Sequence, residues 1–473
     1  MSSNTSLKQG KPSLFSHLKE ALTGENQDYT QGSVQKAIFL LAIPMILEMF
    51  MESVFAVVDI YFVGKLGKNE AIATVVLTES MLTIVYSLAM GLSMAATAVV
   101  ARRVGEKNHD AASRTGVQAI VVSLIITLVV SITGLVFAEE LLKLMGASAK
   151  TIETGKGYTQ WMFGGSIVII LLFLINGIFR GAGNAAIAMR SLWIANICNI
   201  ILCPILIIYG AGPVPALGLT GAAIATNIGR GIGVLYQLYH LFRGKGIIRI
   251  NLEFLRPDFK IIRNLLNIAW SGTAQFLITS ASWIVLARIV SEFGDTAVAG
   301  YGVAIRLMMF FLLPAYGMSN AAATMVGQNL GAGLPDRAEQ AVWKTAKYNT
   351  IFMGTVTVIF VVFARYIVSF FNADPEVVKE ATLALQIICS GYIFYGIGMV
   401  VTNSFNGAGD TKTPTVINIF GFWLFQVPLA YLLALTFKLG PTGVFLAVVL
   451  AETAISITGI IIFRKGKWKS IKV

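Results

Sequence analysis

Long apolar segments alternate with short polar segments along almost the whole chain. A helix needs about 20 apolar residues to cross the hydrocarbon core of a bilayer, because each residue adds about 1.5 Å to its length. Twelve segments meet this requirement: 36–63, 71–100, 115–138, 157–178, 188–210, 218–241, 263–291, 297–326, 346–370, 381–404, 415–437 and 442–463. The pattern therefore predicts an all-α integral membrane protein with twelve transmembrane helices.

The second half of the chain repeats motifs of the first half at a nearly constant separation. The run that starts at Gly91 matches the run at Gly317, and Phe179-Arg-Gly-Ala-Gly matches Phe405-Asn-Gly-Ala-Gly. Each half contains an even number of predicted spans, so both halves insert with the same orientation. The sequence predicts two pseudo-symmetric six-helix bundles. A site between two such bundles can open to either side when one bundle rocks against the other.

The polar segments beside the two bundles complete the expected domain organisation. Apolar residues recur at helical spacing between Pro12 and Leu22, which favours either an amphipathic helix on the membrane surface or a disordered tail. We expect a cytoplasmic N-terminal tail at 1–35, an N-terminal lobe at 36–242, a basic cytoplasmic linker at 243–262, a C-terminal lobe at 263–463 and a basic cytoplasmic tail at 464–473.

Composition and charge agree with a membrane protein. Hydrophobic residues make up 56% of the chain and charged residues 13%, with a formal net charge of +12. Most of the 36 Lys and Arg residues fall in loops and tails on one side of the predicted topology, and the positive-inside rule assigns that side to the cytoplasm. This distribution predicts a multi-pass protein of the cell (inner or plasma) membrane with both termini cytoplasmic. It argues against a nucleic-acid partner.

The sequence has no motif typical of an enzyme or a nucleotide-binding protein. Its three Cys and three His lack the spacing of a disulfide framework or a metal site. The runs 180–183 and 406–409 contain glycines but lack the strand and the lysine of a phosphate-binding loop, so we interpret them as helix caps in tight turns. We expect no enzyme activity, no cofactor and no nucleotide.

Three carboxylates lie inside the first apolar span. At about 100° per residue, Glu48, Glu52 and Asp59 share one face of that helix with Phe55. A charge at the bilayer centre costs about 2.5–3.5 kcal/mol, so this face must look into protein or water. Pro44 precedes the carboxylates and is expected to act as a hinge, because proline removes a backbone donor. The alternative for Glu48 and Glu52 is a polar seam between helices.

Other polar residues in the spans extend this candidate site. Asn176, Asn196, Asn199 and Thr226 are candidates to bind the coupling cation together with Asp59, either H⁺ or Na⁺; ordinary hydrogen bonds between helices are the alternative. The acids belong to the first half, because Gln275 and Leu286 stand at the repeat positions of Glu48 and Asp59. The candidate substrate cavity comprises Met45, Glu48, Glu52, Phe55, Gln275 and Arg306.

Several motifs resemble the multidrug and toxic compound extrusion (MATE) family over residues 36–465. They are Pro44 with Asp59 before Val63-Gly-Lys-Leu-Gly, Gly91-Leu-Ser with Val104-Gly, Asn199-Ile-Ile-Leu-Cys-Pro, Gly218-Leu-Thr-Gly-Ala-Ala-Ile-Ala-Thr and Asn406-Gly-Ala-Gly-Asp-Thr. The resemblance implies an antiporter that exports amphipathic, often cationic organic compounds or drugs as H⁺ or Na⁺ enters. It also implies that Asp59 is the cation site, with Na⁺ as the only metal in question. We expect a monomer.

The sequence departs from the family at two points. Some relatives use a glutamate on the seventh helix, where this chain has Gln275, so we expect coupling in the N-terminal lobe. Many relatives have an acid before the proline of the fifth helix, where this chain has Cys203.

A flippase for lipid-linked oligosaccharides or peptidoglycan precursors is the nearest alternative function. Such proteins have more spans and a basic central cavity, whereas the candidates here are mainly acidic, although Arg230, Arg288 and Arg306 also lie in spans. A major-facilitator transporter would have a different loop at 102–110. A membrane enzyme would need an acid/base pair or a metal site at one membrane face, and a channel would not need two rocking halves.

Overall fold

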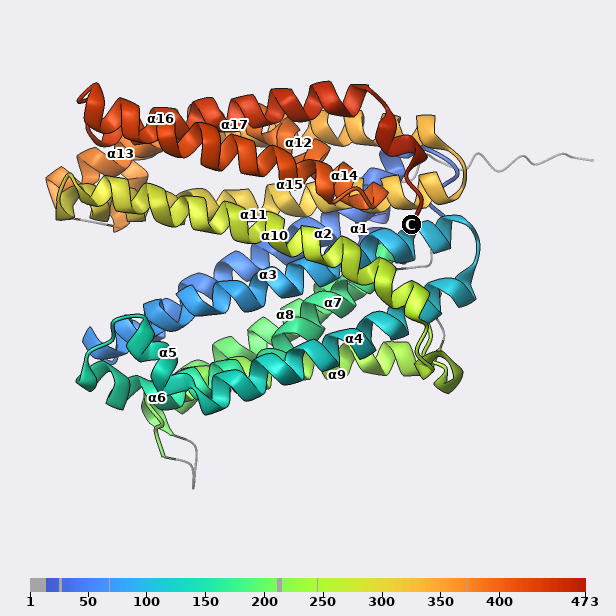
Figure 1. Ribbon diagram of the computed structural model, residues 1–473, viewed down its shortest axis with the longest axis horizontal. Helices are drawn as coiled ribbons and strands as arrows, with labels where there is room; N and C mark the ends of the chain where they lie inside the picture. Colours follow the sequence, from blue (N-terminus) through green and yellow to red (C-terminus); the bar gives the residue numbers. More distant parts are fainter. Residues whose placement is uncertain (1–13, 25–27, 68, 211–214, 245, 372) are drawn as a thin grey trace, which may run out of the picture.

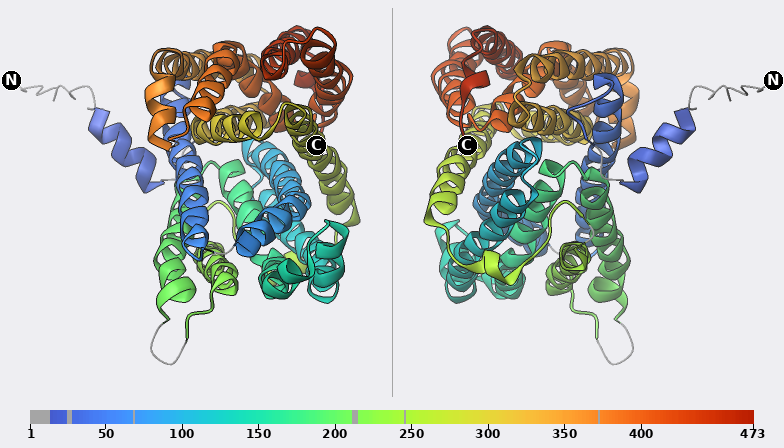
Figure 2. Two further views of the ribbon diagram at one scale, coloured as in Figure 1. Left: turned by 90° about the vertical axis from the view of Figure 1, so that its left-hand side faces the viewer. Right: turned by 90° about the vertical axis from the view of Figure 1, so that its right-hand side faces the viewer.

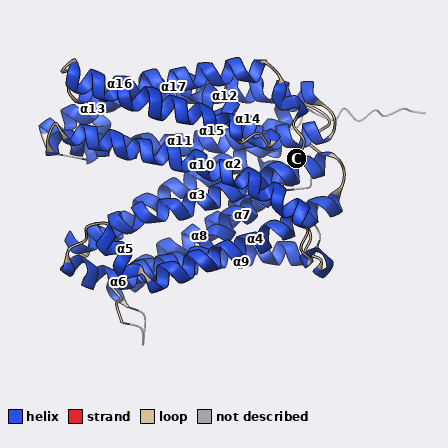
Figure 3. Cartoon of the chain, viewed as in Figure 1, coloured by secondary structure: helices blue, strands red, loops and turns tan. Residues whose placement is uncertain are grey.

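The computed structural model describes residues 14–24, 28–67, 69–210, 215–244, 246–371 and 373–473, and this part of the chain contains helices and loops but no strand (Figure 1, Figure 3). The first half contains α1 (Leu14–Thr23), α2 (Val34–Gly64), α3 (Asn69–Gly105), α4 (His109–Val136), α5 (Ala138–Leu144), α6 (Ala149–Gly164), α7 (Ser166–Gly181), α8 (Ala185–Pro204) and α9 (Leu219–Arg243). The second half contains α10 (Phe259–Ser291), α11 (Asp295–Gly331), α12 (Pro335–Phe371), α13 (Pro375–Ser390), α14 (Tyr392–Ala408), α15 (Lys412–Asn418), α16 (Val427–Tyr431) and α17 (Pro441–Arg464).

Short segments of other helix types complete the elements. The π-helices are η1 (Ile205–Tyr209), η3 (Ile419–Gln426) and η4 (Leu432–Thr436). The 3₁₀-helices are η2 (Leu252–Leu255) and η5 (Lys467–Ser470). Because η1 continues α8 and the two other π-helices join α15 and α16 end to end, each of these two predicted spans is one irregular but continuous membrane crossing.

Every predicted span coincides with helix in the structure. Within the described residues, ten helical segments are long and apolar enough to cross a membrane, and the pair α13 and α14, bent by 55°, makes an eleventh. The remaining predicted span is α9, which carries the buried polar side chains Arg230 and Gln237. These two side chains point into the bundle, so α9 crosses the membrane without being uniformly apolar.

The helices form two lobes, α2–α9 and α10–α17, which lie one above the other in the end-on views (Figure 2). The first helix of each lobe also packs against the other lobe: α2 lies against α11, and α10 lies against α3. α2 packs against α8 of its own lobe as well. A change in the shape of α2 therefore acts on both lobes at once.

The backbone repeats between the lobes as the sequence predicts. Gly183 and Gly409, the last residues of the two matching Gly-Ala-Gly runs, have φ angles of 84° and 88°. Only glycine adopts this left-handed conformation without strain, so both runs end their helices in the same way. The fold is therefore all-α, with two pseudo-symmetric bundles.

The lobes meet most closely at the end of the molecule that holds α1 and the C-terminal segment (Figure 1). There, a Cβ on Gly105 of α3 would lie 1.9 Å from the carbonyl oxygen of Gln328 on α11. Gln328 Nε2 donates to Gly181 O at 3.0 Å, and Arg102 Nη2 donates to Ala408 O at 3.2 Å. The interlobe hydrogen bonds of the described residues cluster at this end, which we call the terminal end.

Both terminal segments take part in this closure. Arg337 of α12 donates to the carbonyl oxygens of Tyr29, Gln31 and Gly32, which precede α2. Arg102 also donates to Ile471 O at 2.9 Å. α1 lies beside α2, but residues 1–13 and 25–27 of the predicted N-terminal tail lie outside the described residues, and the membrane-surface position of α1 stays a prediction.

Candidate cation and substrate sites

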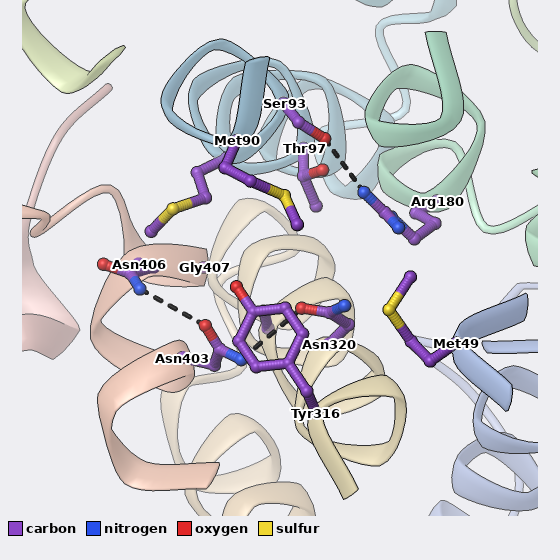
Figure 4. A pocket seen from close by; sticks show the side chains of 12 residues that line it. Met49, Met90, Ser93, Thr97, Arg180, Tyr316, Asn320, Asn403, Asn406 and Gly407 are labelled. Carbon is purple, nitrogen blue, oxygen red and sulfur yellow. Dashed lines mark hydrogen bonds between the residues drawn. The ribbon is translucent and has the colours of Figure 1, made fainter. Parts of the chain in front are cut away.

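The three carboxylates of α2 face their own lobe, and each has a different set of partners. Glu48 is fully buried. Its Oε1 accepts a hydrogen bond from Asn176 Nδ2 at 2.9 Å and forms an ion pair with Arg180 Nη1 at 3.0 Å. Arg180 also donates from Nη2 to Ser93 Oγ at 2.9 Å (Figure 4). Both arginine and glutamate are thus removed from water and compensate each other, which is the condition for a stable buried charge.

A chain of amides and hydroxyls extends from Glu48 into the lobe. Asn176 Oδ1 accepts hydrogen bonds from Ser191 Oγ at 2.8 Å and from Gln237 Nε2 at 2.6 Å. These side chains come from α7, α8 and α9, so the network ties three helices to α2. Asn176 therefore belongs to the surroundings of Glu48 and not to those of Asp59.

Glu52 has its own arginine one helical turn further along. Arg230 Nη2 of α9 lies 3.1 Å from Glu52 Oε1, and Asn196 Nδ2 donates to Glu52 Oε2 at 3.1 Å. The Arg230 guanidinium also lies over three aromatic rings, those of Phe55, Tyr86 and Phe173, with its Cζ 5.2–5.7 Å from their centroids. Cation–π contacts of this kind stabilise a buried guanidinium.

Asp59 differs from the other two carboxylates because no arginine or lysine within the described residues forms an ion pair with it. It is 7% exposed, and among the described residues its hydrogen-bond donor is the thiol of Cys203, whose Sγ lies 3.8 Å from Oδ1. The thiol also lies 3.4 Å from Asn199 Oδ1, and Asn199 Nδ2 donates to Thr226 Oγ1 at 3.0 Å. The structure thus brings Asn199 and Thr226 to Asp59, and it places the predicted Asn196 with Glu52.

The remaining candidates of the sequence analysis are spread over both lobes. Met45 is 1% exposed and packs between the lobes, where its carbonyl oxygen touches Gly317. Pro44 lies inside the continuous helix α2. Arg306 of α11 is exposed, and Gln275 of α10 lines a cavity in the C-terminal lobe. The predicted substrate set is therefore not gathered in one pocket.

A small cavity of about 30 Å³ lies between the lobes (Figure 4). Met49 and Arg180 line it from the N-terminal lobe, and Tyr316, Asn403 and Asn406 from the C-terminal lobe. A second cavity, of about 190 Å³, lies within the C-terminal lobe and shares Tyr316 and Asn403 with the first. Its lining also includes Gln275, Tyr395 and Glu452.

Sequence reasoning missed the two arginines as partners of the acids. The sequence predicts Arg180 at a helix cap in a tight turn, whereas its side chain reaches into the lobe from the last turn of α7. It places Arg230 within a span but indicates no partner for it. The sequence does contain one indication of these pairs, because an arginine inside an apolar helix requires an acid at the same depth.

The chain is similar in sequence and structure to known proteins. The family model described as MatE matches residues 44–205 and 273–432. One relative is the probable multidrug resistance protein YoeA of Bacillus subtilis, which is 25% identical over 94% of this chain and 97% of that protein. Another is an FAD transporter of Shewanella oneidensis, which is 26% identical over 84% of this chain and 88% of that protein. A solved structure of a multidrug resistance MATE family transporter of the MOP superfamily, in an outward-facing conformation, is 25% identical with a TM-score of 0.88, covering 94% of this chain and 99% of that one.

Proposed function

Because this chain belongs to the MatE family of membrane transporters, we propose that it is a multidrug efflux antiporter. In this proposal it exports amphipathic, often cationic organic compounds from the cell in exchange for H⁺ or Na⁺. The terminal end faces the cytoplasm, and the protein acts as a monomer in the cell membrane. The family consists of ion-coupled transporters that need no cofactor, and the chain is not an enzyme.

The observation that carries the proposal is the unpaired carboxylate of Asp59. Glu48 and Glu52 have arginine partners, so of these three acids Asp59 is the one whose charge is not balanced by an ion pair. A buried carboxylate without a counter-ion is stable only when it binds a proton or another cation. Loading and unloading of this one group can therefore couple cation entry to a change of shape.

The surroundings of Asp59 favour H⁺ over Na⁺ as the coupling ion. Na⁺ is a hard cation that requires several oxygen ligands, and the thiol of Cys203 occupies the space between Asp59 and Asn199. A proton needs no such coordination shell. If Na⁺ binds instead, Asn199 Oδ1 and Thr226 Oγ1 are the oxygens that would join Asp59.

The position of α2 suggests how the cation acts on transport. α2 contacts α8 in its own lobe and α11 in the other, and Pro44 interrupts its hydrogen-bond ladder. We propose that Asp59 takes up the cation from outside and that α2 then bends at Pro44, which reshapes the space between the lobes and expels the exported compound to the outside. The lobes then separate at the terminal end, where the cation leaves. Release of the cation to the cytoplasm returns α2 to its starting shape.

The prediction with the largest consequence for this function concerns Asp59→Asn. Asparagine cannot be protonated or bind a cation in the same way, so we expect cation-driven efflux to be abolished while folding is retained. The measurement is efflux of a fluorescent organic cation from proteoliposomes, with proton and sodium gradients imposed separately. Asp110→Asn, at an exposed residue near the start of α4, is the matched control. Efflux at the wild-type rate by Asp59→Asn would remove this residue from the mechanism.

A flippase for lipid-linked precursors remains the second candidate function, and the FAD transporter among the relatives likewise suggests a phosphate-bearing substrate. Both require cationic side chains that are free to bind phosphate. Arg180 and Arg230 are paired with Glu48 and Glu52, and the three acids of α2 outnumber these two arginines. The balance of charge in the N-terminal lobe therefore favours a cationic substrate.

A further inference from the structure

The C-terminal lobe contains a buried carboxylate that the proposed coupling mechanism does not use. Glu452 of α17 is 8% exposed and lines the cavity of about 190 Å³ together with residues of α10, α11 and α14. Among the described residues, no lysine or arginine forms an ion pair with Glu452, and no hydrogen bond to it is found. Its charge is therefore uncompensated inside the lobe.

The position of Glu452 is equivalent to that of Arg230. Each stands twelve residues after the glycine that caps its helix, Gly440 for α17 and Gly218 for α9, and both glycines have a positive φ angle. Gln275 in turn stands at the repeat position of Glu48. The C-terminal lobe thus has an amide where the N-terminal lobe has an acid, and an acid where the N-terminal lobe has an arginine.

Two more polar side chains of this cavity lack partners. Gln275 Oε1 and Ser456 Oγ are buried without a hydrogen-bond partner, in residues that are 8% and 2% exposed. Both line the same cavity as Glu452. Buried polar atoms normally have a partner, and such orphan atoms beside a cavity indicate a ligand that supplies it.

The rest of the lining is aromatic. Phe276, Tyr316, Tyr395 and Phe422 surround the cavity, and the rings of Phe276 and Tyr316 meet edge to face at 6.4 Å. Aromatic faces around one carboxylate are suited to an organic cation, because the ring faces and the carboxylate both attract positive charge. The volume of about 190 Å³ exceeds what an inorganic ion needs and accommodates one aromatic ring of a larger organic cation, whose other groups would extend into the adjoining space between the lobes.

We propose that this cavity of the C-terminal lobe, centred on Glu452, is a binding site for the exported organic cation. The assignment rests on the proposed efflux function and adds to it where the compound is held. Tyr316 and Asn403 line both this cavity and the one between the lobes, so a bound cation lies next to the space through which the lobes separate. The substrate site and the proposed coupling site are then in different lobes.

The test measures binding of tetraphenylphosphonium, whose charge does not depend on pH, to the purified full-length protein. We expect Glu452→Gln to weaken its affinity at least tenfold. The neutral aromatic probe N-phenyl-1-naphthylamine should bind both proteins equally. Glu376→Gln removes one negative charge at an exposed position of α13 and should change neither affinity. Wild-type affinity of Glu452→Gln for tetraphenylphosphonium would overturn the assignment.

A second variant covers the case in which Glu452→Gln does not fold. Phe422→Leu keeps a large apolar side chain at this buried position but removes one aromatic face, so tetraphenylphosphonium should bind about three- to tenfold more weakly while the neutral probe is unaffected. Equal weakening of both probes would overturn the cation site. Efflux of tetraphenylphosphonium by the wild-type protein tests the proposed function separately from the binding site. Asp59→Asn should lose this efflux but still bind tetraphenylphosphonium.

Discussion

The two lobes repeat the same helices but differ in the way they hold buried charge. In the N-terminal lobe, Glu48 and Glu52 lie 3.0 and 3.1 Å from Arg180 and Arg230. In the C-terminal lobe, Glu452 occupies the position equivalent to Arg230 and lies among aromatic rings without an ion pair in the described residues. The pseudo-symmetry of the backbone therefore does not extend to the buried charges. Paired charges hold helices together, whereas an unpaired one leaves room for a cation.

Removal of an arginine partner should have the largest effect on this comparison. Arg180→Met leaves Glu48 buried without its counter-ion, which destabilises a protein by about 3–5 kcal/mol. We expect a large fall in Tm of the detergent-solubilised protein. The double variant Arg180→Met/Glu48→Leu should recover much of that loss, since no isolated charge remains. Glu452→Gln breaks no ion pair and is the control, so it should leave Tm almost unchanged. A similar fall in Tm for Arg180→Met and Glu452→Gln would contradict the distinction between the lobes.

A partner introduced beside Glu452 should convert the C-terminal lobe to the arrangement of the N-terminal lobe. Gln275→Lys places an ammonium group at the repeat position of Glu48, in the cavity that Glu452 lines. An internal cation should compete with the organic cation and weaken tetraphenylphosphonium binding at least tenfold, about 1.4 kcal/mol. Equilibrium binding to the purified protein measures the change, and Gln275→Met is the size-matched control. Unchanged affinity of Gln275→Lys would show that the cavity does not hold the probe.

A smaller effect is expected from Arg230→Lys. Lysine keeps the charge opposite Glu52 but loses the planar guanidinium over Phe55, Tyr86 and Phe173. The loss of these contacts should destabilise the protein by about 1 kcal/mol. We expect a modest fall in Tm, smaller than that of Arg180→Met. A fall as large as for Arg180→Met would mean that the rings, more than the ion pair, hold Arg230 in place.

The sequence predicted the positions of the helices well, because hydropathy is a local property. Every predicted span coincides with helix, and the repeated glycine turns at 183 and 409 adopt the same conformation. The family resemblance is confirmed by the MatE match over residues 44–205 and 273–432. The face shared by Glu48, Glu52 and Asp59 followed from helical periodicity alone, since it depends on one helix.

The grouping of side chains could not be predicted in the same way. Sequence reasoning collected Asn176, Asn196, Asn199 and Thr226 around Asp59, whereas the structure distributes them among three carboxylates. Arg180 lies 132 positions from Glu48 along the chain, and nothing local indicates that they meet. Their contact depends on how α7 packs against α2.

The order of amino acids is enough to specify a bundle of membrane helices in two matching halves, with acids on the face of the first span that must avoid lipid. Which of these acids are neutralised depends on the packing of the helices, because an ion pair requires two helices at the right depth and rotation. The spacing of Arg230 and Glu452 from their capping glycines follows from the sequence, but only the contacts between helices show that Arg230 has an acid partner and that Glu452 has none among the described residues. This difference gives the lobes different electrostatic properties, and it depends on side chains that lie far apart in the chain.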